Sequence, residues 1–132
     1  MANGKIKADT LEHSTAGSLD TNYVVDGRKG FCNFNQGTPA ITDSLNTSSL
    51  TDTSAGKGAV NWTNAMGNAN YTCTTGTATV AASPYVVSLN DNTAFVARTS
   101  SAWSFQTNYA NASASAIFDS NFSICAAYGD LA

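Results

Sequence analysis

Charge is scarce in this chain. Only 11% of its 132 residues are charged, with six Lys and Arg against nine Asp and Glu, whereas an average soluble protein has about 25%. Nucleic-acid binding needs clustered Lys and Arg that displace counterions from phosphates. Four of the six cations lie before residue 30, together with four acidic residues, and the net charge is −3. These features argue against a nucleic-acid partner.

The side chains that usually perform catalysis are also few. His13 is the only histidine and Glu12 the only glutamate, so no Ser-His-Asp or Cys-His set is indicated, and a glycosidase pair would need two aspartates. Four aspartates stand beside Ser, Thr or Asn at expected turns, where carboxylates accept backbone N–H bonds: Asp43, Asp52, Asp91 and Asp119. We therefore expect no catalytic residues and a non-enzymatic protein.

Cysteine occurs three times, an odd number, at widely separated positions. Cys32, Cys73 and Cys125 do not form a complete disulfide framework, and each lies in a run of β-formers within two residues of a large apolar side chain: Phe31, Tyr71 or Ile124. We expect buried, reduced thiols that pack as small apolar groups. A zinc site that joins them to His13 is an alternative, although the close ligand pairs of structural zinc sites are missing.

Metal and cofactor signals are weak elsewhere. The segment Asn90-Asp91-Asn92 offers oxygen ligands to Ca²⁺, but it lacks EF-hand spacing and supplies too few ligands alone. The prediction is no cofactor and no metal, with Ca²⁺ left as an alternative.

Long apolar runs are absent as well. The first seven residues, MANGKIK, contain no apolar segment of signal-peptide length, and no later run approaches a membrane span. We expect a chain that is made in a cytoplasm and does not insert into a membrane.

Abundant Ser, Thr and Asn, about a third of the chain, accompany short runs of β-forming residues. Short polar turns separate most runs and leave no room for crossover helices, so neighbouring strands should be antiparallel. The pattern predicts an all-β sandwich or jelly-roll-like domain of seven to nine strands. The expected strands are Phe31–Asn35, Ser44–Thr51, Gly58–Thr63, Ala69–Thr75, Pro84–Leu89, Thr93–Thr99, Ala102–Tyr109 and Ala116–Tyr128.

Alternation with a period of two predicts which side chains face inward. The expected inward sets are Val60 with Trp62; Tyr71 with Cys73; Phe95 with Ala97 and Thr99; and Phe122 with Ile124, Ala126 and Tyr128. Residues 1–28 lack this pattern and are broken at Ser14–Ser18. We therefore divide the chain into an N-terminal attachment or trimerisation arm, 1–28, and a β-sandwich domain, 29–132.

A turn-rich centre, Thr53-Ser-Ala-Gly-Lys-Gly58, separates two β-rich runs and predicts a hairpin, because glycine adopts positive φ without a Cβ clash. The surrounding block ITDSLNTSSLTDTSAGKGAVNWTNAMGNANY, residues 41–71, resembles the carboxy-terminal domain of bacteriophage tail fibres, especially those of cyanophages. The resembling pattern is "DSxNxSSxTD, Gly-rich turn, xVNF/W, AMxxANY", and the likeness extends to residues 8–27 and 128–132. Relatives usually show a "KAWVNF"-like strand where this chain has Lys29-Gly-Phe-Cys-Asn-Phe34.

The resemblance implies a phage virion protein: a small, trimeric tail fibre or fibre tip that contributes to host adsorption and is assembled in the host cytoplasm. Its arm would bind other virion proteins, and its domain would face a host surface glycan or protein. A decoration or cement protein on the capsid, neck or tail is the alternative, and a polysaccharide-degrading tailspike is a third class. A marginal core in so small and polar a chain also favours a homotrimer.

Aromatic side chains among Ser, Gly and Asn suit adaptable recognition, because a flat ring gives contact area at little entropic cost. The candidate receptor contacts are Tyr85, Trp103 and Tyr109. For Trp103 and Phe105, two residues apart, core packing is the favoured alternative.

Overall fold

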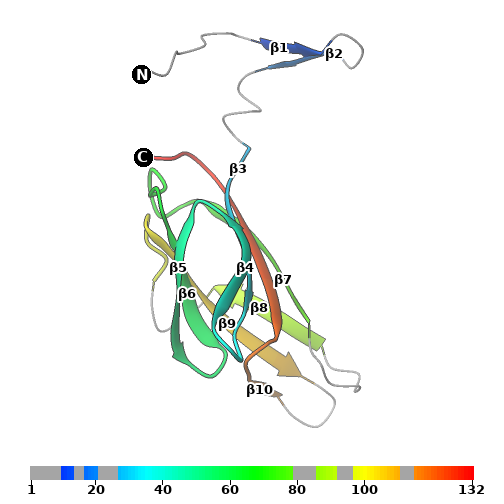
Figure 1. Cartoon of the computed structure of the whole chain (residues 1–132), viewed down its shortest axis with the longest axis vertical. Helices are drawn as coiled ribbons and strands as arrows, with labels where there is room; N and C mark the ends of the chain where they lie inside the picture. Colours follow the sequence, from blue (N-terminus) through cyan, green and yellow to red (C-terminus); the bar gives the residue numbers. More distant parts are fainter. Residues whose placement is uncertain (1–9, 14–16, 21–26, 79–85, 92–96, 111–114) are drawn as a thin grey trace.

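A computed structural model describes residues 10–13, 17–20, 27–78, 86–91, 97–110 and 115–132 (Figure 1). In these ranges every regular element is a β-strand, and no helix long and apolar enough to cross a membrane occurs. Two antiparallel sheets pack against each other. The predicted all-β antiparallel sandwich is confirmed.

One sheet has four strands in the order β4-β3-β11-β7. They are β4 (Ala40–Leu45), β3 (Arg28–Asn35), β11 (Phe122–Tyr128) and β7 (Thr72–Ala78). β3 and β11 are the central strands and pair Cys32 with Cys125. We call this the β11 sheet.

The other sheet has five strands and is called the β9 sheet. They are β5 (Thr47–Ser54), β6 (Lys57–Trp62), β9 (Ala102–Ala110), β8 (Val86–Asp91) and β10 (Ser115–Ile117). β8 pairs with residues 105–110 of β9, while β6 and β10 pair with 102–106 and 108–110. Since β8 occupies one edge of β9, β6 and β10 must share the opposite edge. The described residues thus contribute nine strands to the sandwich, within the predicted range.

Two further strands lie in the predicted arm. β1 (Thr10–His13) and β2 (Gly17–Asp20) form a two-stranded antiparallel sheet of their own. The attachment or trimerisation role of residues 1–28 stays a prediction.

The chain passes from one sheet to the other at Asn46, between β4 and β5. Asn46 has φ 55, a left-handed conformation that asparagine tolerates better than most residues. Its side chain accepts a bond from Asn64 N at 2.7 Å and donates to Asn64 O at 3.0 Å. The predicted strand Ser44–Thr51 is therefore wrong as one element, because this corner divides it between the sheets.

Large apolar side chains of the β9 sheet fill most of the core. Trp103 is 0% exposed, and the ring of Phe105 lies 5.0 Å from that of Phe34 in the β11 sheet. Trp62 donates from Nε1 to Tyr71 Oη at 3.2 Å, and Tyr71 Oη donates to Ala102 O at 2.8 Å. The inward positions of Val60 with Trp62 and of Tyr71 with Cys73 are confirmed, since all four belong to or pack against the core.

Several strand boundaries differ from expectation. Residues 97–99 are not in a strand, and the rest of the predicted strand Thr93–Thr99 falls largely on 92–96, outside the described residues. The run Ala116–Tyr128 is interrupted at 118–121 and forms β10 and β11. The predicted strand Ala69–Thr75 begins only at Thr72, and β4 was not expected as a strand of its own.

Candidate functional site

Three chain turns converge at one end of the sandwich, which we call the turn end: residues 36–39, 55–56 and 118–121. Gln36 N donates to Ser120 O at 2.8 Å, and Gly56 N donates to Asp119 Oδ1 at 2.6 Å. Thr107 N donates to Gly56 O at 2.8 Å. These bonds tie turns from both sheets into one surface. The predicted turn-capping role is confirmed for Asp119. Asp43 Oδ1 also accepts a backbone bond, from Ser44 N at 2.9 Å, but both residues lie within β4 and no turn is capped there.

The opposite end, which we call the terminal end, holds the start of β3 and the last residues of the chain (Figure 1). Met66 and Leu131 form a β-bridge, and Gly67 N donates to Asp130 O at 2.7 Å. The loop that follows β6 is thereby fixed to the C-terminal segment. The terminal end thus holds the start of β3 and the C-terminal segment, whereas the turn end holds three turns between strands.

A buried polar network lies behind the turn end. Gln36, 5% exposed, donates from Nε2 to Thr107 Oγ1 and Ser123 Oγ, each at 2.7 Å, and its Oε1 accepts from Thr107 Oγ1 at 3.0 Å. No buried side-chain N or O atom of the described residues lacks a hydrogen-bond partner. Because Thr107 and Ser123 belong to different sheets, the network fixes how the sheets meet.

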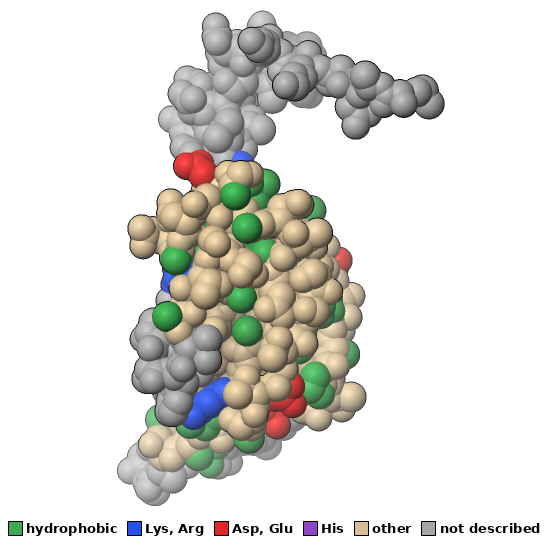
Figure 2. Space-filling model, turned by 90° about the vertical axis from the view of Figure 1, so that its left-hand side faces the viewer, with side chains coloured by type: hydrophobic (Ala, Val, Ile, Leu, Met, Phe, Trp, Pro, Cys, Tyr) green, Lys and Arg blue, Asp and Glu red, His purple; other side chains and the backbone are tan. Residues whose placement is uncertain are grey.

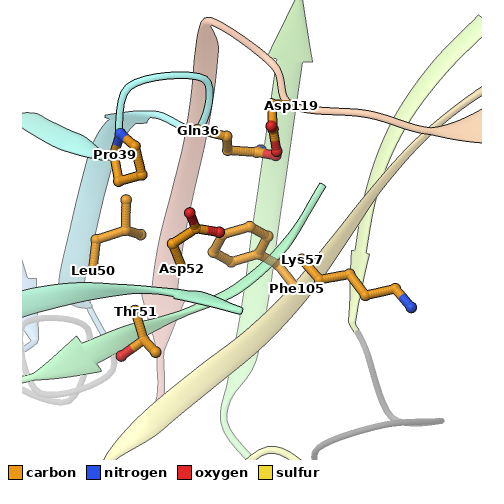
Figure 3. A pocket seen from close by; sticks show the side chains of 8 residues that line it. All are labelled: Gln36, Pro39, Leu50, Thr51, Asp52, Lys57, Phe105 and Asp119. Atoms are coloured by element: carbon orange, nitrogen blue, oxygen red, sulfur yellow. The ribbon is translucent and has the colours of Figure 1, made fainter. Parts of the chain in front are cut away.

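The hollow beside this network is too small for an organic ligand. It has about 10 Å³ of free space, roughly the volume that one water needs. Figure 3 shows its lining side chains, with Gln36 near Asp119 and the Lys57 ammonium directed away from the Phe105 ring. This hollow is a packing gap.

The candidate receptor residues differ in their exposure and in whether the structure describes them. Tyr109 is half-buried near the turn end, where its ring meets Phe118 edge-on at 5.4 Å. Trp103 is fully buried, so its proposed receptor contact is wrong, because β9 directs it between the sheets. Tyr85 lies outside the described residues. Of the candidates, Tyr109 alone is shown at least partly on the surface.

The outer face of the β9 sheet is polar around β5 and β6. Asn61 donates from Nδ2 to Ser49 Oγ at 3.0 Å and to Thr51 Oγ1 at 2.9 Å. Figure 2, viewed from the side on which β5 and β6 lie in Figure 1, shows apolar side chains as separate spots and few charged groups. Hydroxyls and amides therefore keep this face hydrated.

The outer face of the β11 sheet is apolar. Phe122, Ile124 and Tyr128 of β11 are 52%, 36% and 38% exposed, and Leu45 of β4 is 48% exposed. Ser123, Cys125 and Ala127 face the core instead. The predicted inward face of β11 is therefore wrong: large rings of the β9 sheet occupy the core, and only small side chains fit opposite them.

A shallow hollow of about 160 Å³ lies on this same face. The Arg28 guanidinium carbon lies 4.3 Å from the centre of the Phe31 ring, and the aliphatic side chain of Ile124 lies over Gly76, where a Cβ would meet it at 3.0 Å. The lining residues are Arg28, Phe31, Asn33, Thr74, Thr75, Ile124, Cys125 and Ala126.

A second, more polar hollow of about 290 Å³ lies at the terminal end. Its oxygen and nitrogen groups come from Asn68, Asn70, Thr72 and Asp130, beside the Tyr128 ring. Asn68 Oδ1 accepts from Asn70 N at 2.7 Å. No group of three or more His, Cys, Asp or Glu in the described ranges can hold a metal ion.

The three cysteines are free thiols gathered around β11. Cys32 and Cys125 are opposite one another and buried, and Cys73 packs beside them. Burial raises the pKa of Cys32 from 9.0 to about 11. Burial, followed by the neighbouring thiols Cys32 and Cys73, raises the pKa of Cys125 still further. The prediction of buried reduced thiols is confirmed for Cys32 and Cys125, whose sulfurs are poor nucleophiles, whereas Cys73 is only half-buried.

These thiols make folding sensitive to alkali. Because folding raises both pKa values, the protonated thiols favour the folded state. Their contribution to the free energy of unfolding is complete below the unfolded-state pKa near 9.0 and declines as the pH rises above it. We expect the free energy of unfolding to fall by about 1.4 kcal/mol per pH unit for each thiol, measured by urea unfolding between pH 7 and 10.5. A Cys125→Ala variant should show a shallower decline, and equal slopes in the two proteins would contradict this origin.

No protein-family model, curated protein or solved structure matches the chain. The site is therefore defined by geometry alone: a turn end, a terminal end, a polar outer face and an apolar outer face.

Proposed function

We propose that this protein is a non-enzymatic structural component of a bacteriophage particle, a small trimeric tail fibre or fibre tip that contributes to host adsorption. The sequence resemblance of residues 41–71 supports the proposal, and a β-sandwich is compatible with it. The observation that carries it is the arrangement of the two ends. β3 enters the domain at the terminal end, whereas the tied turns and Tyr109 lie at the other.

This arrangement suits a protein that is held at one end and makes contact at the other. The predicted arm, residues 1–28, runs up to the first residue of β3 and would bind other virion proteins near the terminal end. The turn end would then face the host, where Tyr109 and the half-buried Phe118 offer rings beside exposed polar turns. Such a mixture of rings, amides and hydroxyls suits a host surface glycan or protein.

The trimeric state is the part of the proposed function that an experiment can test most directly. Low charge weakens repulsion between copies, and exposed apolar side chains gather on one face. Equilibrium sedimentation at micromolar concentration should give three times the chain mass of 13.6 kDa. A folded monomer under these conditions would remove the trimer from the proposal.

Position and copy number on the particle test the role in adsorption. Electron microscopy of purified particles with the protein labelled should show a few copies on the tail, and added free protein should compete with particles for host cells. Hundreds of copies on the head would support a decoration or cement protein instead. Release of reducing sugars from host envelope glycans would contradict a non-enzymatic role.

A further inference from the structure

We infer that the apolar outer face of the β11 sheet is the contact between copies of this chain, with Phe122 of one copy seated in the hollow around Phe31 of the next. This inference rests on the proposed trimer and assigns its interface.

The distribution of exposed apolar side chains selects this face. Six large apolar side chains are exposed among the described residues, and four of them, Leu45, Phe122, Ile124 and Tyr128, lie on the β11 sheet. The β5 and β6 region of the other outer face carries a hydrogen-bonded set of hydroxyls and an amide instead. Water therefore finds hydrogen-bond partners on the outer face around β5 and β6, and few on the exposed apolar side chains of the β11 sheet.

The face also contains both parts of a self-complementary contact. Phe122, 52% exposed, is the most exposed large apolar side chain of the described chain. Two residues further along β11, Ile124 lines a hollow of about 160 Å³, together with Phe31 and Ala126 among others. A projecting ring and an apolar hollow on one face favour a second copy as the occupant, because every copy supplies both.

Rotational symmetry can join such contacts into a closed ring of copies. If Phe122 of each copy enters the hollow of the next, the contact is heterologous and forms a ring when the rotation between copies closes. The centre of the hollow carries no acidic side chain, and Arg28 at its margin already packs on the Phe31 ring. The nearest acidic side chain on this face, Asp43, lies on β4 opposite Asn33 and is exposed, at the edge of the hollow.

Disulfide trapping tests the geometry. Phe122 pairs with Ala78, so Thr74, which lines the hollow, is four residues away along β7, roughly 13 Å. That span is too long for a disulfide within one chain. Mild oxidation of a double variant, Ala78→Cys with Thr74→Cys, which keeps the Phe122 ring, should therefore link separate chains into covalent trimers. The unmodified protein and a Leu131→Cys, Thr74→Cys variant, whose first site is 45% exposed at the terminal end, should give none.

A second variant tests the energetics without new thiols. Phe122→Ser should weaken association about 30-fold per contact, hence by about four orders of magnitude for a ring of three contacts, with thermal unfolding of the monomer little changed. Leu131→Ser should leave the association unchanged. A trimer that persists in Phe122→Ser and fails to cross-link would overturn this interface alone. A monomeric unmodified protein would overturn the proposed trimer together with it.

Discussion

Replacing Gly58 with alanine is expected to destabilise the folded protein by about 3 kcal/mol or more. A Cβ at this position would lie 2.3 Å from Thr51 O and 2.8 Å from Phe105 Cζ, and backbone on the neighbouring strand cannot move aside without breaking the β5–β6 pairing. Thermal unfolding should show a decrease of roughly 10 °C in Tm for a chain of this size.

Gly67→Ala is the matched control for this substitution. Its Cβ would meet no atom closer than 3.5 Å, and it lies in the loop at the terminal end. It should change the Tm by no more than a few degrees. Equal effects of the two substitutions would show that the close approach at Gly58 does not hold in solution.

Truncation of Trp103 to alanine is expected to cost about 3–5 kcal/mol, a large part of the 5–15 kcal/mol typical of a whole domain. Its side chain is 0% exposed and lies 5.6 Å from the Phe105 ring, centre to centre. Chemical denaturation should show a lower midpoint, or no cooperative unfolding at all. Trp103→Phe keeps much of the volume and should lose less.

Tyr109→Ala separates folding from recognition. Tyr109 is half-buried at the turn end, so its truncation should cost about 1 kcal/mol while lowering competition with particles for host cells. If Trp103→Ala reduced that competition while unfolding at the same denaturant concentration as the unmodified protein, its burial in the core would be refuted.

Local patterns predicted the fold class well. The turn at Gly56 has φ 65, a conformation that favours glycine for local steric reasons, so the β5–β6 hairpin could be predicted from the sequence. Val60 and Trp62 were placed correctly because they alternate with polar or small neighbours. Short loops left no room for crossover helices, and this made the strands antiparallel.

The face of β11 was not predictable by the same logic. Its two alternating sets are Phe122, Ile124, Ala126 and Tyr128 on one side and Ser123, Cys125 and Ala127 on the other, and size alone suggested that the larger set is buried. Trp103 and Phe105 from β9 already fill the space between the sheets, so β11 presents its small side chains to them. The sequence did contain one indication: the summed volume of the rings expected in the core leaves little room for another strand that points aromatic side chains inward.

By itself, the sequence determined that this is an antiparallel β protein with a hairpin centred on a glycine turn, because these features depend on neighbours along the chain. Tertiary structure decided which rings are buried, where the chain changes sheets at Asn46, and which outer face is apolar. Those outcomes depend on competition for one shared interior between strands far apart in the sequence, and no local pattern records that competition.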